Sequence, residues 1–435
     1  MTTETGKQGR GFRDTAAGII GNVLEWYDFA AFGFLAPYIA VAFFPSDNEF
    51  AGLIKTFAIF AVGYLMRPLG AIFFGHIGDR VGRREALLLS VLMMIVPTIL
   101  VGVLPTYAAV GITAPILLLL LRLVQGLSIG GEFTASATFV SELAPEGRKG
   151  LHASLTMLGA ILGILMGSGV AMVLTTTLGE DAMTGWAWRL PFLMGIVLGA
   201  VAFWMRRSMS SSPEMTEIHA GKDERDHPLI DVLKNHRPAL LRLSSVVLMQ
   251  GASFYVIFVW LSTYLKEIVE RPISDPLLLN TIGLACLLPV IPLAGWLSDR
   301  FGRRVLLLTA GIGILVCSWP LFLIFQQGDS GMILAGLVVF AVFIGMAQGP
   351  TPAMMTELFP PEVRLTGIGL GYNVTLALFG GTAPLISTWL ISATGLPTAP
   401  AFYLMAAAGI SLIGVLGLPG RHTNQVHNAG SEHHE

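Results

Sequence analysis

Long apolar runs dominate the chain, and short polar or Pro/Gly-rich stretches separate them. A helix that spans a bilayer needs about 20 consecutive, mainly apolar residues. By this measure the sequence predicts twelve spans. They lie near residues 16–40, 51–74, 86–104, 115–141, 151–175, 188–206, 238–265, 276–297, 305–325, 332–355, 366–391 and 399–418.

The one long polar connection, Met209 to Arg237, divides these spans six and six. We therefore expect four parts. They are an N-terminal six-helix half over 1–207, a central loop over 208–237, a C-terminal six-helix half over 238–420 and a tail over 421–435. Lys and Arg gather in the connections on one side of the predicted membrane. The positive-inside rule makes that side cytoplasmic and places both termini there.

Composition supports an integral membrane protein, because 54% of the 435 residues are hydrophobic and only 12% are charged. A soluble domain has roughly 25% charged residues. The net charge of −2 does not point to a nucleic-acid partner. Cys286 and Cys317 lie in apolar runs without CxxC spacing, which argues against a disulfide framework. Residues 1–15 are polar and the first apolar run is too long for a cleavable signal.

The chain repeats itself. GHIGDRVGRREALLLS at 75–90 returns as GWLSDRFGRRVLLLTA at 295–310, and SELAPEGRKG from Ser141 is matched by TELFPPEVRLTG from Thr356. Both pairs recur in the same order and in matching places among the spans. The two halves are therefore predicted to be parallel repeats, an arrangement found in transporters whose binding site lies between the halves.

These motifs resemble the major facilitator superfamily. Its GxxxDRxGRR loop signature follows spans two and eight, and RLVQGLSIGGE from Arg122 is similar to its span-four motif. The stretches GNVLEWYDF, LMRPLG, WAWRLPF and YNVTLALFGGTAP resemble its metabolite–proton symporters, which carry citrate, 2-oxoglutarate, shikimate, proline or betaine. The resemblance implies an all-α integral membrane fold. It has twelve transmembrane helices in two six-helix halves related by a pseudo-two-fold repeat.

Charged residues inside apolar spans are expensive and usually functional. Asn22, Glu25 and Asp28 share one face of span one, at spacing i, i+3, i+6. Two neighbouring carboxylates do not ionise independently, so we expect Glu25 and Asp28 to couple transport to protons. The alternative is a structural ion pair that locks span one to another helix. Glu132, in span four, is predicted to be a gate or proton-exit residue.

The cations within the spans are Arg67 and Arg122. They are expected either to neutralise the span-one carboxylates or to hold an anionic substrate. Gln125, which shares the face of Arg122, is a candidate substrate contact. Lys55 opens span two, where it either snorkels to water or attracts anions. In the second half Tyr255 and Asn373 are candidate substrate contacts, although such groups also join helices to one another.

The repeated cytoplasmic loops carry a separate charged cluster. In the family resembled, such a cluster latches the halves shut on the cytoplasmic side. The residues assigned to it are Asp79, Arg80, Arg83, Glu142, Arg148, Asp299, Arg303, Glu357 and Arg364.

The sequence and the resemblance together predict a proton symporter that imports a small carboxylate, such as citrate or another di- or tricarboxylate, by alternating access across a bacterial inner membrane. The alternative is a proton symporter for a zwitterionic osmolyte (proline or betaine) or for a shikimate-like acid. Osmosensing relatives carry a coiled-coil C-terminal extension and this chain stops soon after Gly420, which weakens the osmolyte alternative. The cations Arg67, Arg122 and Lys55 favour a di- or tricarboxylate, which would bind them directly.

The expected partners are the substrate, protons and the lipid bilayer, for a protein expected to be a monomer without a cofactor. No enzymatic activity is expected. GLSIG at 126–130 matches the hydrolase motif GxSxG, but Ser128 falls in a helical span rather than a strand–turn–helix elbow.

Overall fold

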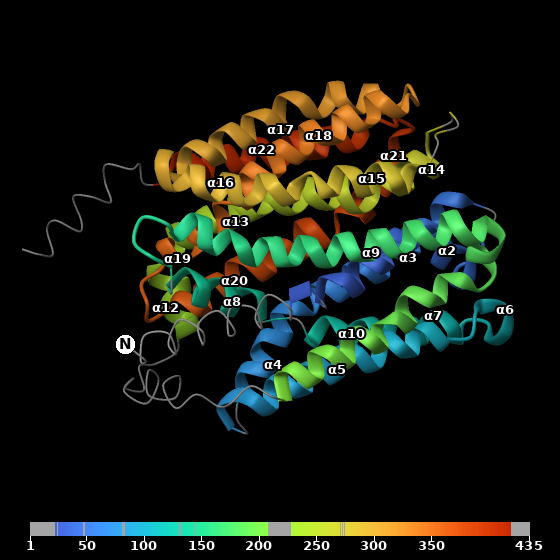
Figure 1. Ribbon diagram of the computed structural model, residues 1–435, viewed down its shortest axis with the longest axis horizontal. Helices are drawn as coiled ribbons and strands as arrows, with labels where there is room; N and C mark the ends of the chain where they lie inside the picture. The colour runs from blue at the N-terminus through green and yellow to red at the C-terminus, as the bar shows by residue number, and fades with distance from the viewer. Residues whose placement is uncertain are drawn as a thin grey trace, which may run out of the picture.

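The structure is a computed structural model that describes residues 22–23, 25–46, 48–80, 83–128, 130, 132–142, 144–207, 228–269, 271, 273 and 275–418. All regular secondary structure in these ranges is helical. Figure 1 shows the helices of the first part of the chain, in blue to green, lying beside those of the second part, in yellow to red. The expected all-helical architecture is confirmed.

The helices of the first part begin with a segment at Glu25–Phe34. It is followed by α2 (Ala36–Phe43), α3 (Glu49–Leu65), α4 (Arg67–Arg80), α5 (Arg83–Val103), α6 (Tyr107–Val110), α7 (Thr113–Ser128), α8 (Glu132–Glu142), α9 (Lys149–Gly185), the 3-10 helix η1 (Ala187–Arg189) and α10 (Leu190–Arg207).

The helices of the second part begin inside the predicted central loop. They are α12 (Pro228–Asn235), α13 (Arg237–Phe254), the π-helix η2 (Tyr255–Trp260), α14 (Leu261–Glu267), α15 (Pro276–Ala285), α16 (Leu287–Phe301), α17 (Arg303–Phe325), α18 (Ser330–Gln348), α19 (Thr351–Leu358), α20 (Arg364–Thr375), the π-helix η3 (Leu376–Gly381), α21 (Ala383–Thr394) and α22 (Ala399–Leu416).

Several of these segments combine into membrane spans. Within the described ranges, 8 continuous helices are long and apolar enough to cross a bilayer, and a ninth candidate is the pair Glu25–Phe34 and Ala36–Phe43, bent by 67°. Three shorter apolar helices lie at Leu88–Val103, Thr113–Ser128 and Ala187–Val201. Together they occupy the twelve places predicted from the apolar runs.

Proline explains two breaks near the centre of the bundle. Pro37 stands in the first turn of α2, where the missing N–H removes one hydrogen bond to the preceding turn. Pro68 stands in the first turn of α4, directly after Arg67. The break at this point separates α3 from α4 at Met66.

Small residues let the first span approach α9 closely. Gly163 lies so near span one that a Cβ at this position would fall 2.3 Å from the carbonyl oxygen of Val23. Glycine at this position therefore permits the close packing of the two helices. On its other side α9 packs against α15 and α16, so it lies at the junction of the two parts of the chain (Figure 1).

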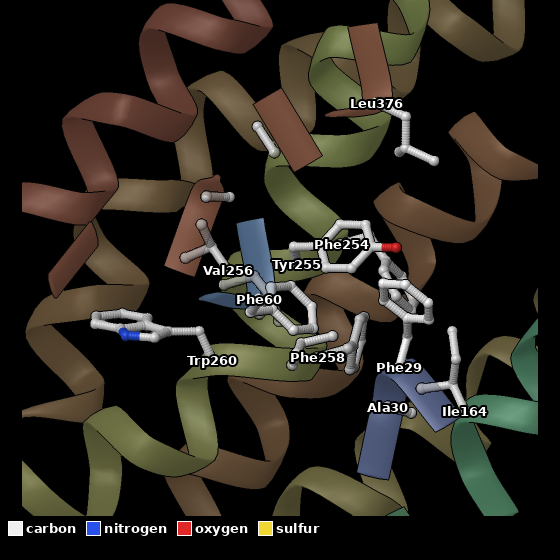
Figure 2. Close-up of a cluster of buried hydrophobic side chains, with 14 of the residues drawn as sticks. Phe29, Ala30, Phe60, Ile164, Phe254, Tyr255, Val256, Phe258, Trp260 and Leu376 are labelled. Carbon is white, nitrogen blue, oxygen red and sulfur yellow. The ribbon is translucent and has the colours of Figure 1, made fainter. Parts of the chain in front are cut away.

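The two parts also share one buried apolar cluster. Figure 2 shows Phe29, Phe60 and Ile164 from the first part together with Phe254 and Tyr255 from the second. The junction between the parts is therefore lined largely by aromatic side chains, and the candidate site lies against this cluster.

Candidate functional site

The first buried ion pair joins span one to the break between α3 and α4. Arg67 Nη2 donates to Glu25 Oε1 at 2.8 Å, and the two side chains are 1% and 3% exposed. The guanidinium carbon of Arg67 lies 5.0 Å from the ring centre of Trp26 and 4.6 Å from that of Tyr64. A guanidinium held against ring faces in this way gains cation–π stabilisation.

The second buried ion pair lies one helical turn further along span one. Arg122 Nη1 of α7 donates to Asp28 Oδ2 at 2.9 Å, and Gln125 Nε2 donates to the same oxygen at 2.9 Å. Thr98 Oγ1 of α5 lies 2.8 Å from Asp28 Oδ1. Asp28 thus collects donors from two other helices, whereas Arg122 lies against the ring of Phe32 at 3.9 Å.

Phe29 lies close to both ion pairs. The guanidinium carbons of Arg67 and Arg122 both lie 5.6 Å from the centre of its ring. Phe29 also lines the narrow space between the two parts of the chain. One aromatic ring therefore contacts the arginines of both pairs and also lines that space.

The space itself is apolar and tight. Its gaps amount to about 180 Å³, none admits a water-sized sphere, and it is lined by Trp26, Phe29, Ala30, Phe60, Tyr64, Ile164, Tyr255 and Val259. The hydroxyls of Tyr64 and Tyr255 share a hydrogen bond of 2.6 Å across it. Tyr255 begins π-helix η2, and π-helical turns are frequent at functional sites.

A second row of rings crosses the junction beside Trp26. The rings of Trp26 and Phe133 meet edge to face with centres 6.3 Å apart. Phe133 in turn stacks on Tyr372 of α20 at 4.9 Å. Aromatic rings from both parts of the chain therefore line the junction near the Glu25–Arg67 pair.

The remaining predicted site residues have separate surroundings. Asn22 is buried, and neither of its amide atoms has a hydrogen-bond partner within the described ranges. Asn373 Nδ2 donates to the carbonyl of Gly130 at 2.7 Å and so joins the two parts of the chain. Lys55 is exposed, as snorkelling requires. The side chain of Glu132 lies outside the described residues.

The charged cluster at one end of the bundle bridges the two parts of the chain. Asp299 accepts the backbone N–H groups of Gly150 and Leu151, at 2.8 and 3.0 Å, in the first turn of α9. A carboxylate is well placed there, because the first N–H groups of a helix have no partner within it. Arg303 holds Asp299 at 2.7 Å and Glu357 at 3.0 Å. We call this end the motif end.

Two further contacts close the motif end. Arg364 Nη1 donates to Glu142 Oε1 at 2.6 Å, and the hydroxyls of Ser141 and Thr356 share a bond of 2.8 Å. Arg148 is exposed. The predicted latch residues Asp79, Arg80 and Arg83 have side chains outside the described part of the structure.

The opposite end, which we call the distal end, has a contact that the sequence reasoning missed. Lys266 of α14 donates to Glu180 of α9, and also to the hydroxyl of Tyr38 in α2 at 3.2 Å. Tyr38 in turn donates to Glu180 at 3.1 Å. Charged residues at the ends of spans are ordinary, so the sequence contained no signal for this cluster.

The geometry defines a membrane carrier. Two repeated parts enclose buried ion pairs and an aromatic space, and polar contacts join the parts at both ends. Within the described ranges, no group of three or more His, Cys, Asp or Glu side chains could hold a metal ion. The chain matches the model of the Major Facilitator Superfamily over residues 18–378 and 277–434, and it belongs to that family.

Curated relatives are similar over most of the chain. A proline/betaine transporter of Salmonella typhimurium is 32% identical over 407 residues, which cover 91% of this chain and 81% of that protein. A glycine betaine/proline/ectoine/pipecolic acid transporter of Dickeya dadantii is 30% identical over 414 residues, 93% of this chain and 82% of its own length.

A solved structure confirms the fold. The xylose transporter XylE from E. coli, in a partially occluded inward-open conformation, superposes with a TM-score of 0.74. The match covers 94% of this chain and 98% of that chain at 16% sequence identity. At this identity the likeness concerns the fold alone, which is that of a multi-pass membrane transporter.

Proposed function

We propose that this protein is a proton-driven symporter that imports a small zwitterion of the proline or betaine class by alternating access. The membrane is the bacterial inner membrane, with both termini on the cytoplasmic side. The names of the two relatives above support this substrate class. The proposal replaces the di- or tricarboxylate that the count of cations in the spans favoured.

The observation that carries the proposal is the pairing of both buried arginines. Arg67 and Arg122 each already hold a carboxylate, so the site has no surplus positive charge for a polyanion. An anion that displaced Glu25 from Arg67 would leave that carboxylate buried and uncompensated. Breaking a buried pair costs about 3–5 kcal/mol.

A zwitterion avoids this penalty because it brings both charges. We propose that its carboxylate binds Arg67 while its ammonium group lies near Glu25 and against the surrounding rings. Rings of Trp26, Tyr64 and Tyr255 line the space beside that pair. A quaternary ammonium, which has no N–H to donate, is well suited to ring faces.

The two closed ends suggest the transport cycle. The motif end is joined by Asp299 and Arg364, and the distal end by Lys266. Opening one end at a time exposes the central site to one side of the membrane at a time. We assign the coupling proton to Asp28, whose pair with Arg122 is separate from the pair that binds the zwitterion. Because both pairs and the zwitterion are each neutral, the bound proton gives the loaded site one positive charge, which a negative-inside membrane potential draws inward.

Uptake into proteoliposomes tests the proposal. Radiolabelled betaine, proline and citrate are offered separately, with the lumen more alkaline than the outside. We expect betaine or proline to accumulate above the outside concentration, and a protonophore to abolish this accumulation. Accumulation of citrate without either zwitterion would contradict the substrate class. Zwitterion accumulation that survives the protonophore and the loss of the pH gradient would contradict proton coupling.

A further inference from the structure

The hydroxyl of Thr98 has two acceptors within reach and only one hydrogen to donate. Its oxygen lies 2.8 Å from Asp28 Oδ1 and 2.7 Å from the backbone carbonyl of Met94, four residues earlier in α5. The side chain is 3% exposed, so water does not compete for either bond. Which acceptor the hydroxyl chooses therefore depends on whether Asp28 is ionised or protonated.

Gln125 completes the arrangement. Its Nε2 atom lies 2.9 Å from Asp28 Oδ2 and 2.8 Å from Thr98 Oγ1, so its two hydrogens serve both groups. A threonine hydroxyl has one donor hydrogen and two acceptor lone pairs. Thr98 can thus accept from Gln125 and still donate or accept one further bond at Asp28.

We propose that Thr98 is a positioning residue whose hydroxyl changes direction with the protonation of Asp28. This inference rests on the proposed proton coupling. When Asp28 is ionised, Thr98 donates to Oδ1. When Asp28 takes a proton on Oδ1, the new O–H donates to Thr98 Oγ1, and the Thr98 hydrogen turns to the carbonyl of Met94. The proton comes from hydronium in the water that enters when one end is open, no other covalent bond breaks, and every group stays hydrogen-bonded in both states.

The other charged and titratable groups near Asp28 have fixed partners of their own, so Thr98 is the neighbour that can adapt to the protonation of Asp28. Arg122 faces Asp28 from α7, Arg67 holds Glu25 one turn earlier on the same span, and Tyr27 donates its hydroxyl to the carbonyl of Pro191. Tyr64, on α3, lies beside Arg67. The neighbouring stretches 86–103, 153–179 and 190–205 contain no titratable side chain. Arg122 supplies the fixed charge beside Asp28, and Thr98 adds a bond that adapts to both states.

The test compares Thr98→Val with Thr98→Ser. Valine keeps the shape but removes the hydroxyl, so ionised Asp28 loses a donor and accepts its proton at higher pH. In proteoliposomes the midpoint of the pH dependence of substrate uptake, measured between about pH 5 and 8, is expected to rise by about one unit. Serine keeps the hydroxyl and is expected to retain the wild-type midpoint. Counterflow at equal pH on both sides shows that each variant is a working carrier.

Thr56→Val is the matched control. Thr56 is also fully buried, and its hydroxyl bonds to the carbonyl of Gly52 four residues earlier, as that of Thr98 does to Met94. Its midpoint is expected to stay unchanged. If the valine variant at Thr98 does not assemble, Thr98→Ala removes the same hydroxyl and is expected to raise the midpoint as well.

The outcomes separate this inference from the proposed function. A wild-type midpoint in Thr98→Val, in a carrier that Asp28→Asn uncouples, would overturn the role of Thr98 and leave the symporter intact. Uphill accumulation that persists in Asp28→Asn would overturn the coupling role of Asp28 and, with it, the inference about Thr98. A raised midpoint in the valine variant that serine restores would support the switch.

Discussion

The hydroxyl oxygens of Tyr64 and Tyr255 lie 2.6 Å apart, and their hydrogen bond joins α3 of the first part of the chain to π-helix η2 of the second. Both side chains are almost completely buried. Tyr64 also covers the guanidinium of Arg67 with its ring. The side chain of Tyr64 therefore contacts both the Glu25–Arg67 pair and the second part of the chain. A movement of Arg67 would displace Tyr64 and so alter its hydrogen bond to Tyr255.

The first prediction is that these two hydroxyls act as a unit. Tyr64→Phe and Tyr255→Phe each remove one partner of a buried hydrogen bond, and each is expected to reduce the free energy of unfolding by about 1 kcal/mol. The double variant is expected to lose no more than the worse single variant. Thermal unfolding of the four proteins checks this. Additive losses would show that the two hydroxyls do not depend on each other.

The second prediction separates charge balance from coupling at Asp28. Asp28→Asn leaves Arg122 buried without a counter-charge, and we expect it to reduce stability by about 3–5 kcal/mol and to abolish uphill accumulation. Adding Arg122→Gln removes the unpaired charge, so the double variant is expected to regain much of the stability. It is not expected to regain accumulation, because the carboxylate to which we assign the coupling proton is absent. Recovery of both properties together would show that Asp28 is only structural.

The third prediction concerns the motif end. Asp299 is the acceptor for two N–H groups of α9, and its side chain is 6% exposed. Asp299→Asn keeps the size but removes the charge. We expect the closed state of the motif end to be destabilised by about 1–2 kcal/mol. This shifts the equilibrium between the closed and open states about 5- to 30-fold toward the open state. A cysteine placed at buried Thr351, in a background without Cys286 and Cys317, is expected to react correspondingly faster with a membrane-impermeant thiol reagent. Unchanged reactivity with transport also unchanged would argue against a latch.

The fourth prediction concerns the distal end. Lys266 holds both Glu180 and Tyr38, and it is the cation between them. Lys266→Ala is expected to open this end more often, seen as faster labelling of a cysteine at buried Ser262. The charge exchange Lys266→Glu with Glu180→Lys is expected to restore slow labelling, and high salt to weaken the effect of the wild-type pair. Labelling that stays fast in the exchanged variant would show that the charges do not form the contact.

Much of the fold follows from the sequence because its signals are strong. Spans of about 20 apolar residues and a repeated loop motif specify a helical bundle with little ambiguity. Glu25, Asp28, Arg67 and Arg122 were found for a related reason, since a charge inside an apolar run is conspicuous. The presence of two carboxylates and two arginines also predicted ion pairs. Which carboxylate meets which arginine depends on the packing of three helices, and the sequence does not contain that information.

Other site residues gave no signal. Thr98 is an ordinary residue in an apolar span, where threonine commonly bonds to its own helix, and its second acceptor is visible only in three dimensions. The preference for a polycarboxylate is not supported by the relatives, and the reason is physical. Counting cations along the sequence treated Arg67 and Arg122 as available for substrate, whereas burial requires each to be neutralised within the protein.

The last prediction uses the close approach of Gly381 to Tyr64. A Cβ on Gly381 would fall 2.3 Å from Cβ of Tyr64 and 2.4 Å from its Cγ, which real side chains do not tolerate. Gly381→Ala therefore prevents η3 from packing against α3 as closely as it does here. We expect this variant to reduce the transport rate at least tenfold. In alternating access, the state with both ends closed lies between the state open at the motif end and the state open at the distal end.

Gly369→Ala is the control for this variant. Gly369 lies on α20, which leads into η3, and a Cβ there meets nothing within 4 Å. The control is expected to transport at the wild-type rate. In Gly381→Ala the equilibrium affinity for betaine or proline, measured by thermal stabilisation, is expected to fall by a smaller factor than the transport rate, because an open site still binds substrate. A normal rate in this variant would mean that the contact between Gly381 and Tyr64 is not required during transport.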